Sequence, residues 1–178
     1  GRAGIQTTIF EREAKLGGVP RYVIPAFRIT DEAIDKDVAL MEKYGVEVKC
    51  GAPAPSIDEL KKQGYTHILL ATGAWQAGRL DIPGNVQGVI GWMKEMKTQV
   101  KPNLTGHVVV VGAGNTAMDA ARVAGRMGAC SSTIVYRRTK KEMPADEHEL
   151  ALALADGVAM RELAAPVEQK DGKLRLEK

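Results

Sequence analysis

A glycine-rich turn stands between an apolar run and a helix-forming segment near the middle of the chain. The apolar run is Val108 to Val111, and the turn reads Gly112-Ala113-Gly114-Asn115-Thr116-Ala117. In this G-x-G-x-x-A pattern the first glycine permits a tight turn, the second opens backbone N–H groups to a pyrophosphate, and the alanine lets the helix pack closely. The helix, predicted over Thr116 to Met127, adds its positive dipole end. The pattern predicts a dinucleotide site that includes Gly112, Gly114, Asn115 and Thr116.

Two arginines follow the next apolar run, Thr133 to Tyr136. In sites that prefer NAD, this second strand typically ends in an Asp or Glu that binds the ribose 2′-hydroxyl. Arg137 and Arg138 stand at that place instead, and they would suit the 2′-phosphate of NADPH because guanidinium groups bind phosphate through paired, charged hydrogen bonds. The alternative is a tight strand-to-helix turn beside a solvated arginine pair, with no ligand.

Composition excludes several classes of protein. The 178 residues would suit one domain or two small ones, and 44% hydrophobic with 26% charged residues is ordinary for a globular chain. The net charge of +3, with acids and bases interleaved, gives no reason to expect a nucleic-acid surface. We expect neither a membrane span nor a signal peptide. Cys50 and Cys130, without a C-x-x-C motif, predict buried thiols in a reducing compartment, hence a cytoplasmic protein.

An earlier strand ends in an acid. Thr7 to Phe10 predict this strand, and Glu11 follows it at the place where a carboxylate would bind an adenosine ribose. Alternatively, Glu11 is a surface carboxylate beside Arg12. The glycine-rich turn that should precede such a strand is missing, so we expect the chain to start in the middle of a domain.

Turn and cap signals divide the next residues. Glycines and prolines between Lys15 and Arg28 predict a loop without regular structure. Thr30 predicts the N-cap of a helix that Gly45 ends, and a short strand follows over 46–49. Ser56 predicts the cap of a helix over 57–63.

A second apolar run, Ile68-Leu69-Leu70, predicts a short buried strand. It leads into Ala71-Thr72-Gly73-Ala74, where Thr and Gly let the backbone come close to a ligand. We place a domain boundary near Leu80.

The remaining elements are read from periodicity and turns. A helix is predicted over Gly91 to Val100, and Pro102-Asn103 marks the start of the second domain. An amphipathic helix is expected over Asp146 to Ala155. A hairpin is expected from an extended segment at Ala159 to Leu163 to a return strand at 174–176, with the turn at 171–172.

These blocks, in this order and spacing, resemble the FAD- and NADPH-binding portion of the glutamate synthase small-subunit family, an FAD/NAD(P)-dependent oxidoreductase family. The segment Val19 to Ile29 is most similar to the selenate reductase iron–sulfur subunits, and dihydropyrimidine dehydrogenase carries a similar module. The residues that carry the resemblance are Glu11, Gly17-Gly18, Ile24-Pro25-x-Phe27-Arg28, Ala71-Thr72-Gly73, Gly112-x-Gly114-Asn115-Thr116-Ala117-Met118-Asp119, Tyr136-Arg137-Arg138 and Met143-Pro144.

The resemblance implies an α/β, Rossmann-like, three-layer FAD/NAD(P)-binding fold with parts of two nucleotide-binding domains. Residues 1–80 would be a partial FAD-binding domain that lacks its first glycine-rich turn, and residues 81–178 an NADPH-binding domain truncated at its end. The implied FAD contacts are Glu11, Arg12, Gly17, Gly18, Arg28, Thr72 and Gly73. The implied NADPH contacts are Gly112, Gly114, Asn115, Thr116, Asp119, Arg137 and Arg138.

Two of these residues have a second interpretation. Asp119 is equally well explained as a carboxylate in the first helical turn that complements the helix dipole. Arg28 either approaches the flavin or only ties the proline loop down. No residue is predicted to be catalytic, because the cofactors carry the chemistry, and no metal ligands are predicted.

The functional hypothesis is a fragment of an NADPH-dependent, FAD-containing oxidoreductase that is inactive on its own. Electrons would pass from NADPH through flavin to 4Fe-4S clusters outside this chain, and on to an electron-acceptor subunit or domain. Two alternatives remain: a regulatory or scaffolding domain that binds NADPH without redox chemistry, and a degenerate fold that binds nothing.

Overall fold

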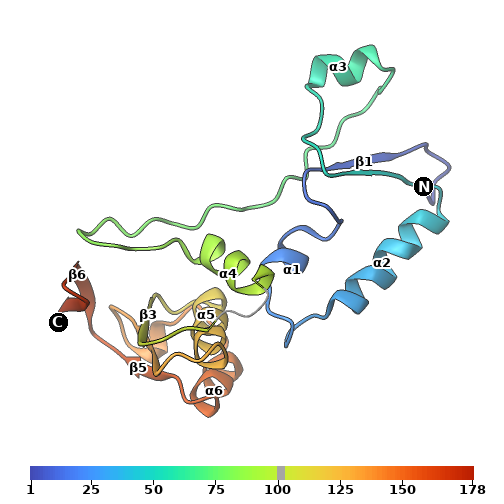
Figure 1. Cartoon of the computed structure of the whole chain (residues 1–178). Coiled ribbons are helices and arrows are strands. Elements are labelled where there is room, and N and C mark those ends of the chain that lie inside the picture. Colours follow the sequence, from blue (N-terminus) through green and yellow to red (C-terminus); the bar gives the residue numbers. More distant parts are fainter. Residues whose placement is uncertain (100–102) are drawn as a thin grey trace. The chain divides into compact units, whose positions relative to one another are not determined.

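The computed structural model describes residues 1–99 and 103–178 and consists of two compact units, Gly1–Ala74 and Trp75–Lys178 (Figure 1). The division therefore falls a few residues before Leu80. Val100, the expected end of a helix, and Pro102, the expected start of the second domain, lie outside the described residues.

The first unit is built on two parallel strands, β1 (Thr8–Glu11) and β2 (Glu47–Cys50). Between them in the chain lies α2 (Asp31–Lys43). Thr30 is its N-cap, and the Thr30 side chain accepts a hydrogen bond from the Ala33 N–H, as the cap signal predicts. Gly45, with φ of 72°, follows the helix in the left-handed conformation that commonly ends helices.

A second, shorter helix of this unit, α3 (Ile57–Lys62), has a complete capping box. The Ser56 Oγ accepts from the Glu59 N–H, and the Glu59 carboxylate accepts from the Ser56 N–H at 2.9 Å. The Ser56 hydroxyl also donates to the Glu59 carboxylate at 2.7 Å, and this bond, followed by the one from the Ser56 N–H, holds the pKa of Glu59 below its ordinary value. The S-x-x-E pattern thus specifies this end of the helix.

Two predictions for the first unit are wrong. The loop expected without regular structure contains α1 (Gly18–Tyr22), because Pro20 sits in the first turn, where its missing N–H costs no helical hydrogen bond. The run Ile68-Leu69-Leu70 is not a strand, and Leu69 and Leu70 are 91% and 72% exposed. Among the described residues the sheet of this unit consists of β1 and β2 alone, so this run has no partner strand.

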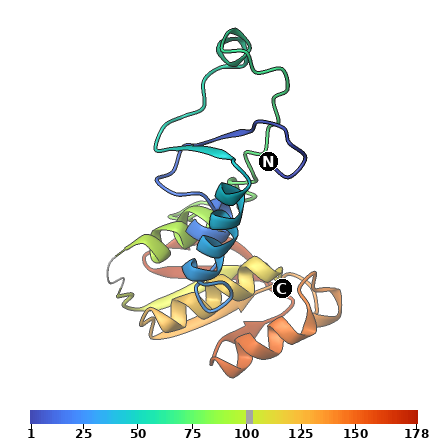
Figure 2. The ribbon, with the colours of Figure 1, turned by 90° about the vertical axis from the view of Figure 1, so that its right-hand side faces the viewer.

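The second unit contains a parallel sheet in the order β3 (His107–Val111), β4 (Ser131–Val135), β5 (Ala159–Arg161). Helix α5 (Asn115–Arg126) crosses from β3 to β4, and α6 (Glu147–Ala155) crosses from β4 to β5; the two helices pack against each other (Figures 1 and 2). A third helix, α4 (Val89–Thr98), packs on α5. This βαβαβ arrangement places the carboxyl ends of all three strands at one edge of the sheet.

Small side chains allow α5 to lie close to the sheet. Its alanines 117, 120, 121 and 124 are at most 8% exposed, and Met118 fills the centre. The hydrophobic core of this unit lies where α5 packs against the sheet and against α6. Its buried members are Ala113, Met118, Ala121, Ile134, Ala145, Ala153 and Val158.

The chain ends in a separate hairpin, β6 (Ala165–Lys170) and β7 (Lys173–Glu177). The predicted turn is confirmed: Asp171 and Gly172 both have positive φ, 50° and 70°. The predicted first arm is wrong, because Ala159–Arg161 pairs with β4 as the third strand of the parallel sheet. The cysteines also differ from expectation, since Cys50 and Cys130 are exposed.

Candidate functional site

The glycine turn between β3 and α5 has the conformation that an anion site needs. Gly112 has φ of 118°, a region that side chains rarely adopt, and Gly114 stands at the N-cap of α5 without any side-chain cap. The first turn of α5 contains no acidic residue. The N–H groups at this helix start therefore have no side-chain cap, and no acid in the first turn neutralises the positive end of the helix dipole.

The space at Gly114 is open. A Cβ added there would have only the Pro144 Cγ within 4 Å, at 3.9 Å. Pro144 belongs to the loop that follows β4, and two hydrogen bonds join this loop to the turn. The Ala145 N–H donates to the Ala113 carbonyl at 3.1 Å, and the Asp146 N–H donates to Asn115 Oδ1 at 3.3 Å. The loop after β4 thus forms one border of the glycine turn.

Three predicted residues of α5 have different surroundings. Asn115 and Thr116 are exposed at the start of the helix, and the Asn115 side chain accepts the bond from the β4–α6 loop. Asp119 is the fifth helical residue and is only 8% exposed. The interpretation of Asp119 as a first-turn carboxylate is therefore wrong.

The register of the sheet brings the two arginines to the same edge as the glycine turn. Val111 pairs with Val135 in the parallel ladder, and the Gly112 N–H donates to the Val135 carbonyl at 3.0 Å. Arg137 and Arg138 follow Val135 by two and three residues, and both are exposed. The turn and the arginine pair thus lie at the carboxyl ends of neighbouring strands.

A third cation at this edge was missed. Arg161 is the last residue of β5, pairs with Val135 in the ladder, and is exposed. The apolar run 158–160 indicates a strand that would end at Arg161. From the sequence alone we assign this run to the first arm of a hairpin instead of to a third parallel strand.

In the first unit, Glu11 ends β1 as predicted. Its carboxylate accepts a hydrogen bond from the Glu13 N–H at 2.9 Å, and its ladder partner is Cys50. Arg12 is exposed and forms an ion pair with Glu13, with 3.7 Å between Nε and Oε1. Glu11 thus has the strand-end position of a ribose-binding acid, whereas Arg12 contacts its neighbour in the chain.

The paired glycines lead into α1 with positive φ, 127° at Gly17 and 50° at Gly18. Nothing lies within 4 Å of a Cβ built on Gly18. A Cβ on Gly17 would lie 2.8 Å from the Cβ of Arg21 and 3.0 Å from a methyl of Ile34. Gly17 is therefore required by packing inside this unit, whether or not a ligand binds beside it.

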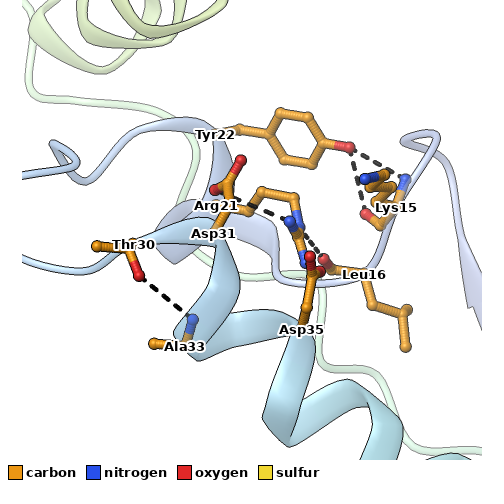
Figure 3. Close-up of polar contacts among 8 residues, drawn as sticks. All are labelled: Lys15, Leu16, Arg21, Tyr22, Thr30, Asp31, Ala33 and Asp35. Atoms are coloured by element: carbon orange, nitrogen blue, oxygen red, sulfur yellow. Dashed lines mark hydrogen bonds and ion pairs between the residues drawn. The ribbon is translucent and has the colours of Figure 1, made fainter.

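Arg21 is the principal residue that sequence reasoning missed, and Figure 3 shows its surroundings. It is 5% exposed, its Nε donates to the Leu16 carbonyl, and its Nη2 donates to Asp35 Oδ1. Asp31, one turn earlier on α2, lies 3.8 Å from Nη1. The guanidinium thus ties the residue before the glycine pair to α2. The signal was an arginine in a glycine-proline loop followed by acids four residues apart.

The remaining predicted flavin contacts are exposed. Arg28 follows a turn in which its N–H donates to the Pro25 carbonyl at 2.9 Å. Thr72 and Gly73 lie in the irregular segment at the end of the first unit, and Gly73 has φ of 75°. Their roles toward FAD stay predictions.

An arginine cluster on the opposite, amino-terminal side of the sheet serves packing. Asp156, just after α6, accepts hydrogen bonds from Arg122 Nε at 2.8 Å and from Arg126 Nη2 at 2.9 Å. These two bonds, that of Arg122 first, hold the pKa of Asp156 below its ordinary value. Within residues 1–99 and 103–178, no three His, Cys, Asp or Glu side chains are grouped as metal ligands, and no helix is long and apolar enough to cross a membrane.

The amino-acid sequence matches a known protein family. Residues 4–172 match the sequence profile of the family described as pyridine nucleotide-disulphide oxidoreductase. The chain belongs to this family. This membership confirms the predicted FAD/NAD(P)-dependent oxidoreductase family. The likeness to solved structures confirms its Rossmann-like α/β fold.

Among known relatives, the chain is 44% identical over 181 residues to the oxidoreductase YgfK of Escherichia coli (strain K12). That alignment covers 98% of this chain and 18% of YgfK. The chain is also 32% identical over 183 residues to the glutamate synthase (NADPH) small chain of Azospirillum brasilense. This second alignment covers 92% of this chain and 38% of that protein. The chain thus spans well under half the length of either relative.

A solved structure of 2-naphthoyl-CoA reductase with 2-naphthoyl-CoA superposes with a TM-score of 0.76 at 18% identity. The superposition covers 97% of this chain and 26% of that one. At this identity the likeness concerns the fold alone.

Proposed function

We propose that this chain is the nucleotide-binding part of an NADPH-dependent, FAD-containing oxidoreductase. The observation that carries the proposal is the parallel register of β3 and β4, in which Val111 pairs with Val135. That register sets the open turn at Gly114 beside the exposed pair Arg137 and Arg138. A dinucleotide needs these two features at adjacent strand ends, one for its pyrophosphate and one for its 2′-phosphate.

The residues present fit NADPH. The pyrophosphate would lie over Gly112 and Gly114, because the position of a Cβ on Gly114 is open and the start of α5 carries no acid. Asn115 and Thr116 would border it, and Arg137 with Arg138 would bind the 2′-phosphate. Asp119 is 8% exposed on α5, and its contact with NADPH stays a prediction.

The fit to FAD rests on fewer observations. Glu11 stands at a strand end, where it would accept from a ribose hydroxyl, and the open position at Gly18 would allow a phosphate to approach. When bound, the two cofactors supply hydride transfer from nicotinamide to flavin. The chain's own residues would bind and orient them, and none would act as a general acid or base.

The finer parts of the proposal concern the whole protein. We propose that the chain belongs to a longer polypeptide, since it spans 18% of YgfK and 38% of the Azospirillum small chain. In that protein, electrons would leave through 4Fe-4S clusters outside this chain to an acceptor subunit or domain. A relationship to selenate reductase iron–sulfur subunits and a cytoplasmic location stay predictions.

One observation favours a second candidate, a domain that binds NADPH for regulation or scaffolding without redox chemistry. The side chain of Arg21 occupies the space beside Gly17, so that glycine has a structural reason that requires no flavin. The two candidates differ in the visible absorption spectrum of the full-length protein. Bound flavin would support the oxidoreductase, whereas NADPH binding without flavin would support the second candidate.

Calorimetric titration of the purified chain with NADPH and with NADH tests the nucleotide site. The variants Arg137→Ala and Arg138→Ala should each weaken NADPH binding by roughly 1.5 to 3 kcal/mol, about tenfold to a hundredfold, and leave NADH binding unchanged. Arg175→Ala is the matched control, because it removes an exposed arginine from the separate hairpin. If neither variant changes NADPH affinity, or if the wild-type chain prefers NADH, the assignment of the 2′-phosphate site is wrong.

A further inference from the structure

The loop that carries Arg137 and Arg138 is held in shape by a neighbouring segment. The Tyr136 N–H donates to the Arg161 carbonyl at 2.9 Å, continuing the ladder of β4 and β5. The Ala164 N–H returns a bond to the Tyr136 carbonyl at 3.1 Å, and the Leu163 N–H donates to the Arg138 carbonyl at 3.2 Å. Residues 161–164 therefore run alongside the arginine loop and fix its backbone.

Leu163 shows that this segment is constrained. It has φ of 51°, in the left-handed region, although it is not glycine and its side chain is 55% exposed. A leucine keeps such a conformation only where the surroundings over-determine it. The bond from its N–H to the Arg138 carbonyl and the burial of Ala164 supply that constraint.

Between Arg161 and Leu163 stands a carboxylate that contacts the loop twice. Glu162 Oε2 accepts a hydrogen bond from the Lys140 N–H at 2.8 Å, and Oε1 lies 3.7 Å from the Lys140 Nζ. The Glu162 side chain is 33% exposed. It therefore anchors the backbone two residues beyond Arg138 and partly neutralises the loop's own lysine.

A carboxylate at this place requires an explanation, because residues 137–141 of the loop carry four cationic side chains and no acid. A negative charge near a bound 2′-phosphate would weaken binding by simple Coulomb repulsion. Its value to the site must then come from geometry: paired guanidinium–phosphate bonds require a fixed backbone beneath the arginines. The exposed cations of the loop are Arg137, Arg138, Lys140 and Lys141.

We propose that Glu162 is a positioning residue for selectivity toward NADPH, acting through the Lys140 N–H to hold the arginine loop in its phosphate-binding shape. The proposal rests on the proposed function, because it takes Arg137 and Arg138 as the 2′-phosphate ligands. Coulomb repulsion alone predicts that removal of the Glu162 carboxylate strengthens NADPH binding. The proposed positioning role predicts the opposite, that its removal weakens binding of NADPH, the more negatively charged nucleotide.

The test is calorimetric titration of the full chain with NADPH and NADH for two variants. Glu162→Ala removes the acceptor for the Lys140 N–H and should weaken NADPH binding about tenfold while NADH binding stays within about twofold. Glu162→Gln removes the charge but keeps an amide oxygen that can accept the same bond, so NADPH affinity should equal or exceed that of the wild type. Equal or tighter NADPH binding by Glu162→Ala would overturn the proposal.

The outcomes separate this inference from the proposed function. If Arg137→Ala leaves NADPH affinity unchanged, the 2′-phosphate site itself is wrong. If Arg137→Ala weakens NADPH binding and Glu162→Ala does not, only the role of Glu162 is wrong. If Glu162→Ala weakens both nucleotides alike, the role of Glu162 in selectivity toward NADPH is wrong.

Amide hydrogen exchange provides a readout that does not depend on a ligand. The Lys140 amide should exchange at least about tenfold faster in Glu162→Ala than in Glu162→Gln, because only the latter retains an acceptor. Equal exchange rates in the two variants would contradict the proposed bond.

Discussion

The side chain of Arg21 occupies the space that a side chain at Gly17 would need. A Cβ built on Gly17 would lie 2.8 Å from the Arg21 Cβ and 3.1 Å from its Nε. The same Nε donates to the Leu16 carbonyl, and Nη2 reaches Asp35 on α2. The glycine and the buried arginine are thus two parts of one packing arrangement, which sets the backbone at the start of α1.

Gly17→Ala should loosen this arrangement. The alanine would meet both an unfavourable φ of 127° and the Arg21 side chain, so we expect local stability to fall by about 2 to 3 kcal/mol. Hydrogen exchange of the peptides that cover α1 and α2 should accelerate correspondingly. Gly18→Ala is the matched control, because its φ of 50° is also left-handed but no atom lies within 4 Å of its Cβ. If Gly18→Ala lowers local stability as much as Gly17→Ala does, the positive φ explains the loss of stability and the clash with Arg21 does not.

Gly114→Ala should separate binding from folding. Gly114 has φ of −89°, which alanine adopts freely, and the atom nearest to a Cβ built there, the Pro144 Cγ, is 3.9 Å away. Thermal unfolding should therefore change by no more than about 1 kcal/mol. Binding of NADPH and NADH should weaken together, because the methyl group would stand where the pyrophosphate approaches. Unchanged affinity for both nucleotides would mean that the glycine serves only the turn.

Asp156→Asn should destabilise the second unit in a pH-dependent way. Hydrogen bonds from Arg122 and then Arg126 lower the pKa of Asp156 from its ordinary value of 3.8. The folded state therefore favours the ionised carboxylate, and this stabilisation is complete above pH 3.8 and is lost as pH falls through the lowered pKa. Near neutral pH the variant should be less stable by about 1.5 kcal/mol.

Urea unfolding of both proteins over a range of pH checks this prediction. The difference between wild type and Asp156→Asn should stay constant from neutral pH down to about pH 5 and then shrink as the carboxylate protonates. A difference that grows toward low pH would contradict the sign of the argument.

Local signals in the sequence were enough to predict most elements. The cap at Thr30, the capping box of Ser56 with Glu59, and the turn at Asp171-Gly172 each depend on residues within a few positions of one another. The glycine turn and the arginine pair were also predictable, because the order strand, turn, helix, strand fixes which strand ends are adjacent.

Contacts between distant residues were not predictable in the same way. The spacing of Asp31 and Asp35 places both acids on one face of a helix, but the path of α2 is needed to identify Arg21 as their partner. Pairing of Ala159–Arg161 with β4 depends on the position of α6 rather than on those three residues. The error hid both Arg161 and the contact of Glu162 with the arginine loop.

The first unit has a thin core, and this has a calorimetric consequence. Its buried apolar side chains are Leu16, Val23, Pro25, Ile34 and Leu60, whereas Leu69 and Leu70 are largely exposed to water in the folded state. Hydration of newly exposed apolar surface is the source of the heat-capacity increase on unfolding, which averages about 12–15 cal/mol/K per residue. The first unit should fall below that average, so its stability should vary less steeply with temperature than that of the second unit.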